Sequence, residues 1–120
     1  MNTQIVIPTY NEKENIAPLI KAIREIIPSA FITVVDDNSP DGTASVVELL
    51  TRKDIKISLI KRTEKGGRGS AVIRGFSEGL KNKKIDLFIE MDGDFSHNPK
   101  ELTRILLATK KTTSSSLLVI

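Results

Sequence analysis

Short runs of consecutive apolar residues alternate along the chain with longer segments in which apolar residues recur every three or four positions. The runs cover residues 5–7, 31–35, 57–60, 86–89 and 116–120. Continuous apolarity is typical of strands that are buried on both faces, as in a parallel sheet, whereas a half-exposed strand alternates. The pattern therefore predicts five strands of one parallel sheet.

The segments between these runs have helical spacing. Their periodic apolar residues are Ile16, Leu19, Ile20, Ile23 and Ile27; Val46, Val47, Leu49 and Leu50; Val72, Phe76 and Leu80; and Leu102, Ile105 and Leu106. Asn15 is expected to cap the first helix. For the fourth helix we expect Asn98 as the N-cap, Pro99 at the first helical position and Glu101 completing a capping box.

Strands that alternate with helices predict an α/β fold with three layers, a mostly parallel, doubly wound sheet with helices on both faces. The 120 residues are enough for one domain, and they show no internal repeat and no linker. The sequence stops within an apolar run, so this is either a short protein with its last strand at an edge or the front part of a longer one. The second is favoured, because a parallel strand needs both faces covered. Either way, an uncovered final strand predicts self-association.

Composition narrows the classes of function. The net charge is a mild +3, no long basic tract occurs, and aromatic residues make up 4%, so nucleic acid is not an expected partner. Without cysteine there is no disulfide framework and no thiolate metal site. No apolar run approaches the roughly 20 residues that span a bilayer. The first residues do not resemble a signal peptide, so a cytoplasmic location is expected.

Polar and glycine-rich segments follow the predicted strands at their carboxyl ends. They are PTYNE (8–12), DDNSPDGT (36–43), KRTEKGGRGS (61–70) and MDGDFSHN (91–98). In open α/β sheets, ligands bind outside the carboxyl ends of the strands, at the point where the strand order reverses. We expect the fourth strand to lie beside the first, so that these segments surround one crevice.

Asp92 and Asp94 come directly after the fourth strand, separated by Gly93. Residues two apart in an extended segment point the same way, so both carboxylates can reach one point. Like charges at one point need a proton or a cation between them, and a hard divalent ion such as Mg²⁺ or Mn²⁺ is the natural choice. The alternative is that one aspartate caps a turn while the other is solvated.

Asp36 and Asp37 end the second strand, where a carboxylate can bind a ribose or a base N–H. The alternative is helix capping, and Ser39 or Asp41 could serve that purpose while Asp37 binds the ligand.

Three further candidates also have ordinary structural interpretations. Tyr10 could stack on a base or be a half-buried loop aromatic, and Glu12 could contact a ligand or be solvated. Residues 66–71, with Arg68, could approach a phosphate at a helix N-terminus or form a plain loop. His97 could add a ligand to a metal or phosphate site, or be a polar group at the start of a helix.

The four segments together resemble a known family. IVIPTYNEKENI, VVDDNSPDGTA, GGRGSAVIRG and EMDGDFSHNPKEL are similar, in this order and spacing, to blocks of the inverting family-two glycosyltransferases, which have the Rossmann-like GT-A fold. The similarity is greatest to the dolichol-phosphate mannosyltransferases and related polyprenyl-phosphate sugar transferases. It runs from about Ile5 to Leu102. Residues 1–120 would then be the nucleotide-sugar-binding part of one GT-A domain, ending after the fifth strand.

The resemblance assigns roles residue by residue. It implies nucleotide contacts by Pro8, Tyr10, Glu12, Val35, Asp37, Asp92, Gly93 and Asp94. Within this set Tyr10 lies on the base, and Asp92 and Asp94 hold a Mg²⁺ or Mn²⁺ ion that bridges the diphosphate. Gly93 stands where alanine is more frequent. Arg68 stands where leucine is frequent, so it receives no firm role.

The activity that this resemblance implies is metal-assisted, inverting transfer of mannose from GDP-mannose to a polyprenyl or dolichyl phosphate at the cytoplasmic face of a membrane. UDP-glucose is the second candidate donor. The non-catalytic alternative is a nucleotide-sugar-binding module that transfers nothing by itself. No residue is identified as a catalytic base.

Overall fold

The nine elements of the fold alternate between strand and helix, as the apolar pattern predicts. The structure is a computed structural model that describes residues 2–63, 66–109 and 116–119. The elements are β1 (Thr3–Thr9), α1 (Ile16–Ile26), β2 (Phe31–Asp36), α2 (Thr43–Lys53), β3 (Ile57–Lys61), α3 (Arg68–Leu80), β4 (Leu87–Glu90), α4 (Glu101–Thr109) and β5 (Ser116–Val119).

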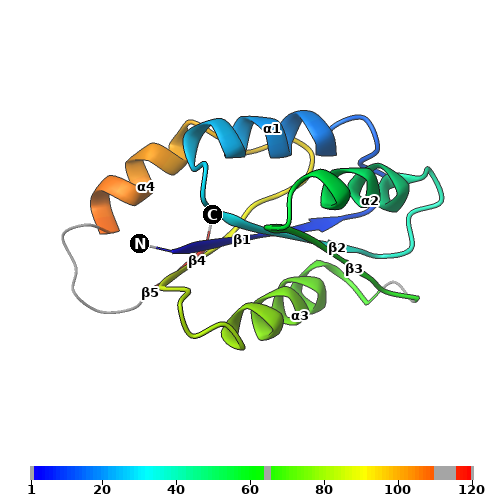
Figure 1. The fold of residues 1–120 in the computed structure, drawn as a ribbon. Helices are drawn as coiled ribbons and strands as arrows, with labels where there is room; N and C mark the ends of the chain where they lie inside the picture. The colour runs from blue at the N-terminus through cyan, green and yellow to red at the C-terminus, as the bar shows by residue number, and fades with distance from the viewer. Residues whose placement is uncertain (1, 64–65, 110–115, 120) are drawn as a thin grey trace.

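The strands form one parallel sheet in the order β3-β2-β1-β4-β5. The order reverses beside β1, which pairs with β2 on one side and with β4 on the other. Helices α1, α2 and α4 cover one face and α3 covers the other, so the fold has three layers (Figure 1). The predicted doubly wound α/β sheet, with β4 next to β1, is confirmed.

Consecutive residues of β1 face opposite layers. Ile5 and Ile7 are fully buried in the larger apolar cluster, together with Ile16 and Leu19 of α1. Val6 belongs to a smaller cluster with Ala71 of α3. Because both faces of the sheet are covered in this way, the strands read as continuous apolar runs.

Helix α3 approaches the sheet closely at two glycines. A Cβ atom at Gly75 would lie 2.5 Å from Cγ1 of Val6, and one at Gly79 would lie 2.0 Å from Oε1 of Gln4. At Gly75 a larger residue would collide with the buried side chains of Val6 and Val35, and at Gly79 it would displace the end of the Gln4 side chain. The two glycines therefore let α3 pack closely on the sheet.

The helix ends differ from the predictions. Asn15 makes no capping hydrogen bond through its side chain; its Nδ2 donates to Glu12 Oε2 at 3.0 Å instead. Helix α4 begins at Glu101 rather than at Pro99. Asn98 Oδ1 accepts a hydrogen bond from the backbone N–H of Lys100.

The predicted capping box is also wrong. The carboxylate of Glu101 pairs with Arg104 one turn ahead instead of reaching back to Asn98. Two of the periodic leucines, Leu49 and Leu80, are 57% and 67% exposed and so contribute little to the core.

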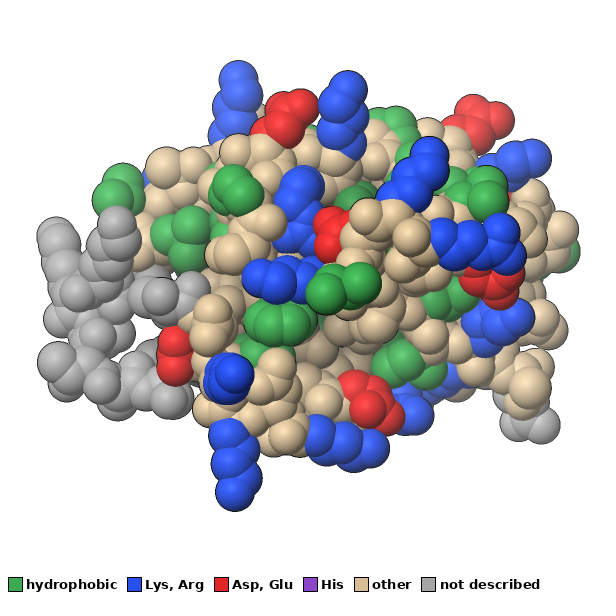
Figure 2. All heavy atoms as spheres, in the orientation of Figure 1, with side chains coloured by type: hydrophobic (Ala, Val, Ile, Leu, Met, Phe, Trp, Pro, Cys, Tyr) green, Lys and Arg blue, Asp and Glu red, His purple; other side chains and the backbone are tan. Residues whose placement is uncertain are grey.

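Strand β5 lies at one edge of the sheet and pairs with β4 from Leu87↔Ser116 to Glu90↔Val119. The side chains of this strand and residues 110–115 and 120 lie outside the described residues, and so does the predicted exposure of an apolar final strand. No helix of the described ranges is long and apolar enough to cross a membrane. On the face shown in Figure 2, Lys and Arg side chains are interspersed with Asp and Glu, in keeping with the mild net charge.

Candidate functional site

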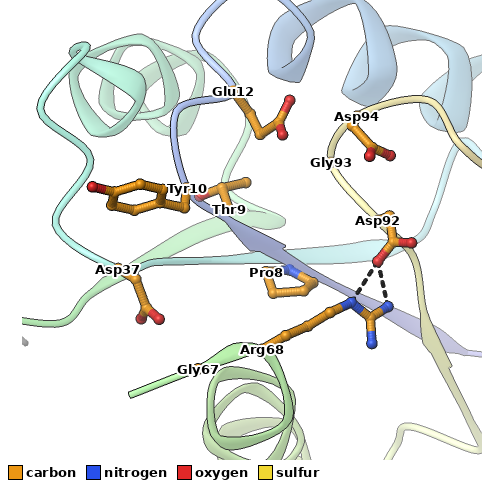
Figure 3. Close-up of a pocket in the computed structure, with 10 residues that line it drawn as sticks. All are labelled: Pro8, Thr9, Tyr10, Glu12, Asp37, Gly67, Arg68, Asp92, Gly93 and Asp94. Atoms are coloured by element: carbon orange, nitrogen blue, oxygen red, sulfur yellow. Dashed lines mark hydrogen bonds and ion pairs between the residues drawn. The ribbon is translucent and has the colours of Figure 1, made fainter. Parts of the chain in front are cut away.

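A pocket of about 310 Å³ opens at the carboxyl ends of the central strands, over the point where the strand order reverses (Figure 3). Its lining comes from the loops after β1, β2 and β4 and from the start of α3. The lining residues are Pro8, Thr9, Tyr10, Glu12, Asp37, Gly67, Arg68, Asp92, Gly93 and Asp94. All of the predicted nucleotide contacts except Val35 therefore lie together.

Val35 is the one predicted contact that does not reach the pocket. Its side chain is fully buried and packs with Val6 and Ala71 between the sheet and α3. Its backbone lies in the middle of the sheet, opposite Pro8 in β1 and Ile60 in β3. The Val35 side chain therefore belongs to the core between the sheet and α3, and a nucleotide contact by Val35 stays a prediction.

On the β1–β2 side of the pocket, residues 9–12 and 36–43, the loops are joined by a buried carboxylate. Asp36 is 1% exposed and accepts hydrogen bonds from Thr9 Oγ1 at 2.7 Å and from the hydroxyl and backbone N–H of Ser39 at 2.6 and 3.0 Å. Ser39 Oγ in turn accepts the N–H of Asn11. Asp36 therefore holds the two loops together and has little accessible surface for a ligand.

A second aspartate extends these links. Asp41 accepts the N–H of Thr43, the first residue of α2, at 2.9 Å, and that of Lys13 at 3.0 Å. Thr43 Oγ1 accepts the N–H of Glu12. The N-cap residue of α2 is Gly42, which makes no side-chain capping hydrogen bond, so Asp41 binds the start of α2 from one position before the cap. The same contacts hold Glu12 beside the pocket.

Asp37 lines the pocket while both of its oxygens are engaged by Arg62. The guanidinium donates from Nε to Oδ1 at 2.5 Å and from Nη2 to Oδ2 at 2.8 Å. This hydrogen-bonded pairing raises the pKa of Arg62. Arg62 also donates to Gly67 O and Ser70 Oγ, so it joins β3 to the start of α3. The sequence analysis missed Arg62, although a basic residue at the end of the strand beside β2 was a usable signal.

The β4 side of the pocket, residues 92–97, carries the two aspartates of the predicted metal site. Ser96 connects them: its hydroxyl donates to Asp92 Oδ2 at 3.0 Å, and its N–H donates to Asp94 Oδ1 at 2.9 Å. Hydrogen bonds from Ser96 lower the pKa of Asp94 below its ordinary value. Nδ1 of His97 lies 3.7 Å from Asp92 Oδ2, too far for a hydrogen bond.

Gly93 packs this loop against the loop after β1. A Cβ atom there would lie 3.2 Å from Thr9 Cγ2 and 3.3 Å from Glu12 Cγ. The close approach places the two aspartates across the pocket from Tyr10 and Asp37 (Figure 3).

Arg68, the first residue of α3, also lines the pocket and received no firm role from the sequence. Its Nε donates to Asp92 Oδ1 at 2.6 Å, and its two terminal nitrogens form ion pairs with Asp92 and Glu90. Glu90, the last residue of β4, is buried. The pairs join residues more than twenty positions apart, so no local pattern reveals them.

The donor set tests whether a divalent ion fits here. The accessible ligands are carboxylate oxygens, which suit Mg²⁺ or Mn²⁺. Within the described residues no group of three or more Asp, Glu, His or Cys side chains is placed to hold a metal ion. Mg²⁺ usually binds through one or two carboxylates together with substrate phosphates and waters. Asp92 and Asp94 therefore fit an ion that a diphosphate shares, rather than a metal centre complete in itself.

A parallel sheet with an acidic pocket at its reversal point defines an α/β ligand-binding domain. The family described as "Glycosyl transferase family 2" matches residues 4–119, and the chain belongs to this family.

Its curated relatives carry related names. The chain is 41% identical over 105 residues to a polyprenol monophosphomannose synthase of Mycolicibacterium smegmatis, 39% identical over 110 residues to an undecaprenyl-phosphate mannosyltransferase of Micrococcus luteus, and 38% identical over 112 residues to a dolichol-phosphate mannosyltransferase of Pyrococcus furiosus. These matches cover 87%, 92% and 92% of this chain, but only 39%, 45% and 30% of the relatives. The chain thus spans less than half the length of each.

Solved structures support the fold. A mannosyltransferase from Pyrobaculum calidifontis in complex with GDP-Man and Mn²⁺ superposes with a TM-score of 0.63 at 26% identity, over 77% of this chain and 27% of that one. The S. aureus protein TarS, residues 1–349 with UDP, superposes with a TM-score of 0.72 at 23% identity, over 92% and 32% of the two chains. The GT-A type of α/β fold is confirmed.

Proposed function

We propose that residues 1–120 are the nucleotide-sugar-binding part of a GT-A glycosyltransferase that transfers mannose from GDP-mannose to a polyprenyl or dolichyl phosphate with inversion. One observation carries the proposal: the pocket at the strand ends brings Tyr10, Asp37 and the Asp92–Asp94 pair together in a member of this family. The names of the relatives support the choice of mannose and of a polyprenyl phosphate.

The two sides of the pocket would bind different parts of the nucleotide sugar. Tyr10, 41% exposed, offers a ring against which a base can stack, and Asp37 lies close to it for the ribose. Asp92 and Asp94 would hold a Mg²⁺ or Mn²⁺ ion beside the diphosphate. When bound, such an ion neutralises the charge that develops on the leaving diphosphate. Pro8 and Glu12 complete the lining of the pocket.

A phosphate acceptor suits a site without an evident general base. A phosphate monoester has a second pKa of roughly 6 and is already largely anionic at neutral pH. It needs less proton removal than a sugar hydroxyl would. Because a polyprenyl phosphate resides in a bilayer, the whole enzyme would act as a peripheral protein at the cytoplasmic face of a membrane.

Calorimetric titration of GDP, UDP and dTDP, each with Mn²⁺ and with EDTA, tests donor binding. We expect GDP to bind most tightly, and only weakly in EDTA. If the folded protein bound none of the three with Mn²⁺ present, the proposal would fail.

A binding module without transferase activity is the second candidate, because the chain spans less than half of each of these relatives. Incubation with radiolabelled GDP-mannose and a polyprenyl phosphate, followed by lipid extraction, separates the two. Labelled lipid formed by the 120-residue chain would exclude the module. Its absence, together with tight GDP binding, would favour it.

Self-association remains part of the proposal. Within the described residues β5 pairs with β4 alone, and a strand with a free edge can pair with another chain. Light scattering over a concentration series should show a dimer or larger species. A monodisperse monomer at high concentration would contradict this.

A further inference from the structure

We propose that Arg68 is a residue that binds the nucleotide sugar: its guanidinium pairs with Asp92 as the structure shows, and it would bind the diphosphate once a metal ion and the nucleotide are bound. This inference rests on the proposed function, since it concerns the same pocket. From the sequence alone Arg68 had no firm role, and an approach to a phosphate was one of two open interpretations.

Both carboxylate oxygens of Asp92 already have partners in the structure. Oδ1 of Asp92 accepts the Nε–H of Arg68 at 2.6 Å and also pairs with a terminal nitrogen of the same guanidinium. Its other oxygen, Oδ2, accepts the Ser96 hydroxyl. A divalent cation on Oδ1 would meet the positive guanidinium at contact distance, where like charges repel strongly in a partly buried site. Asp92 can therefore serve as a full metal ligand only after Arg68 has moved.

Glu90 and Asp92 are two residues apart at the end of β4, and both bond the guanidinium of Arg68. The Glu90 side chain is only 7% exposed. Two neighbouring carboxylates, one of them buried, repel each other, and a cation that bonds both offsets this repulsion. Arg68 is that cation when no metal is bound.

The guanidinium of Arg68 can reach a diphosphate in the pocket without leaving Glu90. The arginine side chain is 49% exposed and extends along the floor of the pocket past Pro8 (Figure 3). Its contact with buried Glu90 does not involve Asp92, so it can persist as an anchor while the rest of the fork turns. Once a metal has neutralised Asp92, the oxygens of a diphosphate in this pocket are the strongest remaining acceptors, and a planar guanidinium binds phosphate well.

This arrangement differs from an ordinary surface ion pair, which contributes little. Arg68 lines the pocket itself and contacts Asp92, one of the two candidate metal ligands, whereas Asp94 accepts its hydrogen bond from Ser96. The metal alone should therefore bind weakly through Asp94, and metal and nucleotide should each strengthen the binding of the other.

The test compares Arg68→Leu with Arg74→Leu. Arg74 is also an arginine of α3, but it pairs with Glu78, away from the pocket, so the two variants lose the same charge. Free Mn²⁺ is measured by electron paramagnetic resonance in titrations without nucleotide, and GDP binding is measured by calorimetry at saturating Mn²⁺.

For Arg68→Leu we expect Mn²⁺ alone to bind about tenfold more tightly and GDP with Mn²⁺ to bind about tenfold more weakly, within the usual range of coupling between two ligands. Arg74→Leu should change neither. Arg68→Lys keeps the charge but lacks the planar fork, and should fall between the parent and Arg68→Leu in both measurements.

Unchanged Mn²⁺ affinity in Arg68→Leu would overturn the inference, and so would tighter Mn²⁺ binding with unchanged GDP affinity. Arg68→Leu leaves the buried carboxylate of Glu90 unpaired. If that variant does not fold, the double variant Arg68→Leu/Glu90→Gln, which also removes the buried charge, takes its place in both titrations. Failure of the proposed function would look different: the parent protein itself would then bind no nucleotide with Mn²⁺.

Discussion

The two sides of the pocket use the same residue type in opposite ways. On the β1–β2 side, the carboxylate oxygens of Asp36 and Asp41 accept hydrogen bonds from neighbouring loops of the protein itself. On the β4 side, Asp92 and Asp94 are tied mainly to Ser96 and to the exposed Arg68. The β1–β2 side is thus held in place by the protein's own hydrogen bonds, whereas the β4 side is held by contacts that a ligand can replace.

Burial accounts for the use of Asp36, which is 1% exposed, whereas Asp41 is only partly buried, as Asp92 is. A buried carboxylate needs internal donors, because an unsatisfied buried charge is very unfavourable, and its donors then become part of the framework. An accessible carboxylate can exchange its partners for a cation without such a penalty. An aspartate after a strand can therefore act as a metal ligand only when its oxygens remain within reach of solvent.

Replacing Asp36 should give the largest loss of stability. Asp36→Ala removes the acceptor of three hydrogen bonds and leaves buried donors without partners, so we expect the free energy of unfolding to fall by about 3 kcal/mol. Urea unfolding measures the change. Glu14→Ala, at an exposed position of the same region, is the control and should change stability by less than about 0.5 kcal/mol. One ordinary hydrogen bond contributes about 1 kcal/mol to stability. If Asp36→Ala lost less than about that amount, the distinction between the two sides would be contradicted.

Breaking the Arg62–Asp37 pair should have the next largest effect. Arg62→Met leaves Asp37, whose side chain is 7% exposed, without its cation, and should cost about 2 kcal/mol, less than a fully buried pair would. The double variant Arg62→Met/Asp37→Leu removes the stranded charge, so it should recover most of the loss in the same urea experiment. If the double variant were less stable than Arg62→Met, loss of the ion pair would not explain the lower stability of Arg62→Met.

Asp94→Ala should leave stability within about 0.5 kcal/mol of the parent, because this aspartate is exposed. It should nevertheless abolish the difference between GDP binding with Mn²⁺ and GDP binding in EDTA, measured by calorimetry. Glu25→Ala, an exposed acid on α1, should retain that difference. Metal dependence that survives in Asp94→Ala would show that the ion binds elsewhere.

The smallest effect concerns the protonation of Asp94. Hydrogen bonds from Ser96 lower its pKa, so the resulting stabilisation is present above the ordinary value of about 3.9 and is lost as the pH falls through the lower folded value. The side-chain carboxyl ¹³C signal of Asp94, followed from pH 7 to pH 2, should titrate below the ordinary value. Ser96→Ala should move the midpoint upward. A midpoint at or above the ordinary value in the parent would contradict this environment.

The sequence predicted the parts of the fold that depend on local pattern. Apolar runs and helical spacing located the elements, and the rule for ligands at strand ends placed Tyr10 and the Asp92–Asp94 pair in one pocket. The pattern could not show which way Val35 faces, because a strand buried on both faces has no polar side to mark its register.

Long-range ion pairs were beyond the reach of the sequence. Arg62 meets Asp37 because β3 and β2 end side by side, and Arg68 meets Asp92 because the start of α3 lies against the segment after β4. The prediction for the start of α4 was wrong for a different reason. A capping box requires a particular side-chain rotamer, and Glu101 forms an ion pair with Arg104 instead.

The most direct test of the central claim is where a metal–nucleotide complex binds. Amide spectra of the isotope-labelled protein would be recorded with GDP and Mn²⁺, using GDP and Mg²⁺ as the diamagnetic reference. The account predicts that Mn²⁺ selectively broadens the amide signals of residues 92–97 and 9–12, while residues 54–56 and 82–86, at the opposite ends of the strands, stay sharp. Broadening centred on that opposite edge, or spread evenly over the molecule, would contradict it.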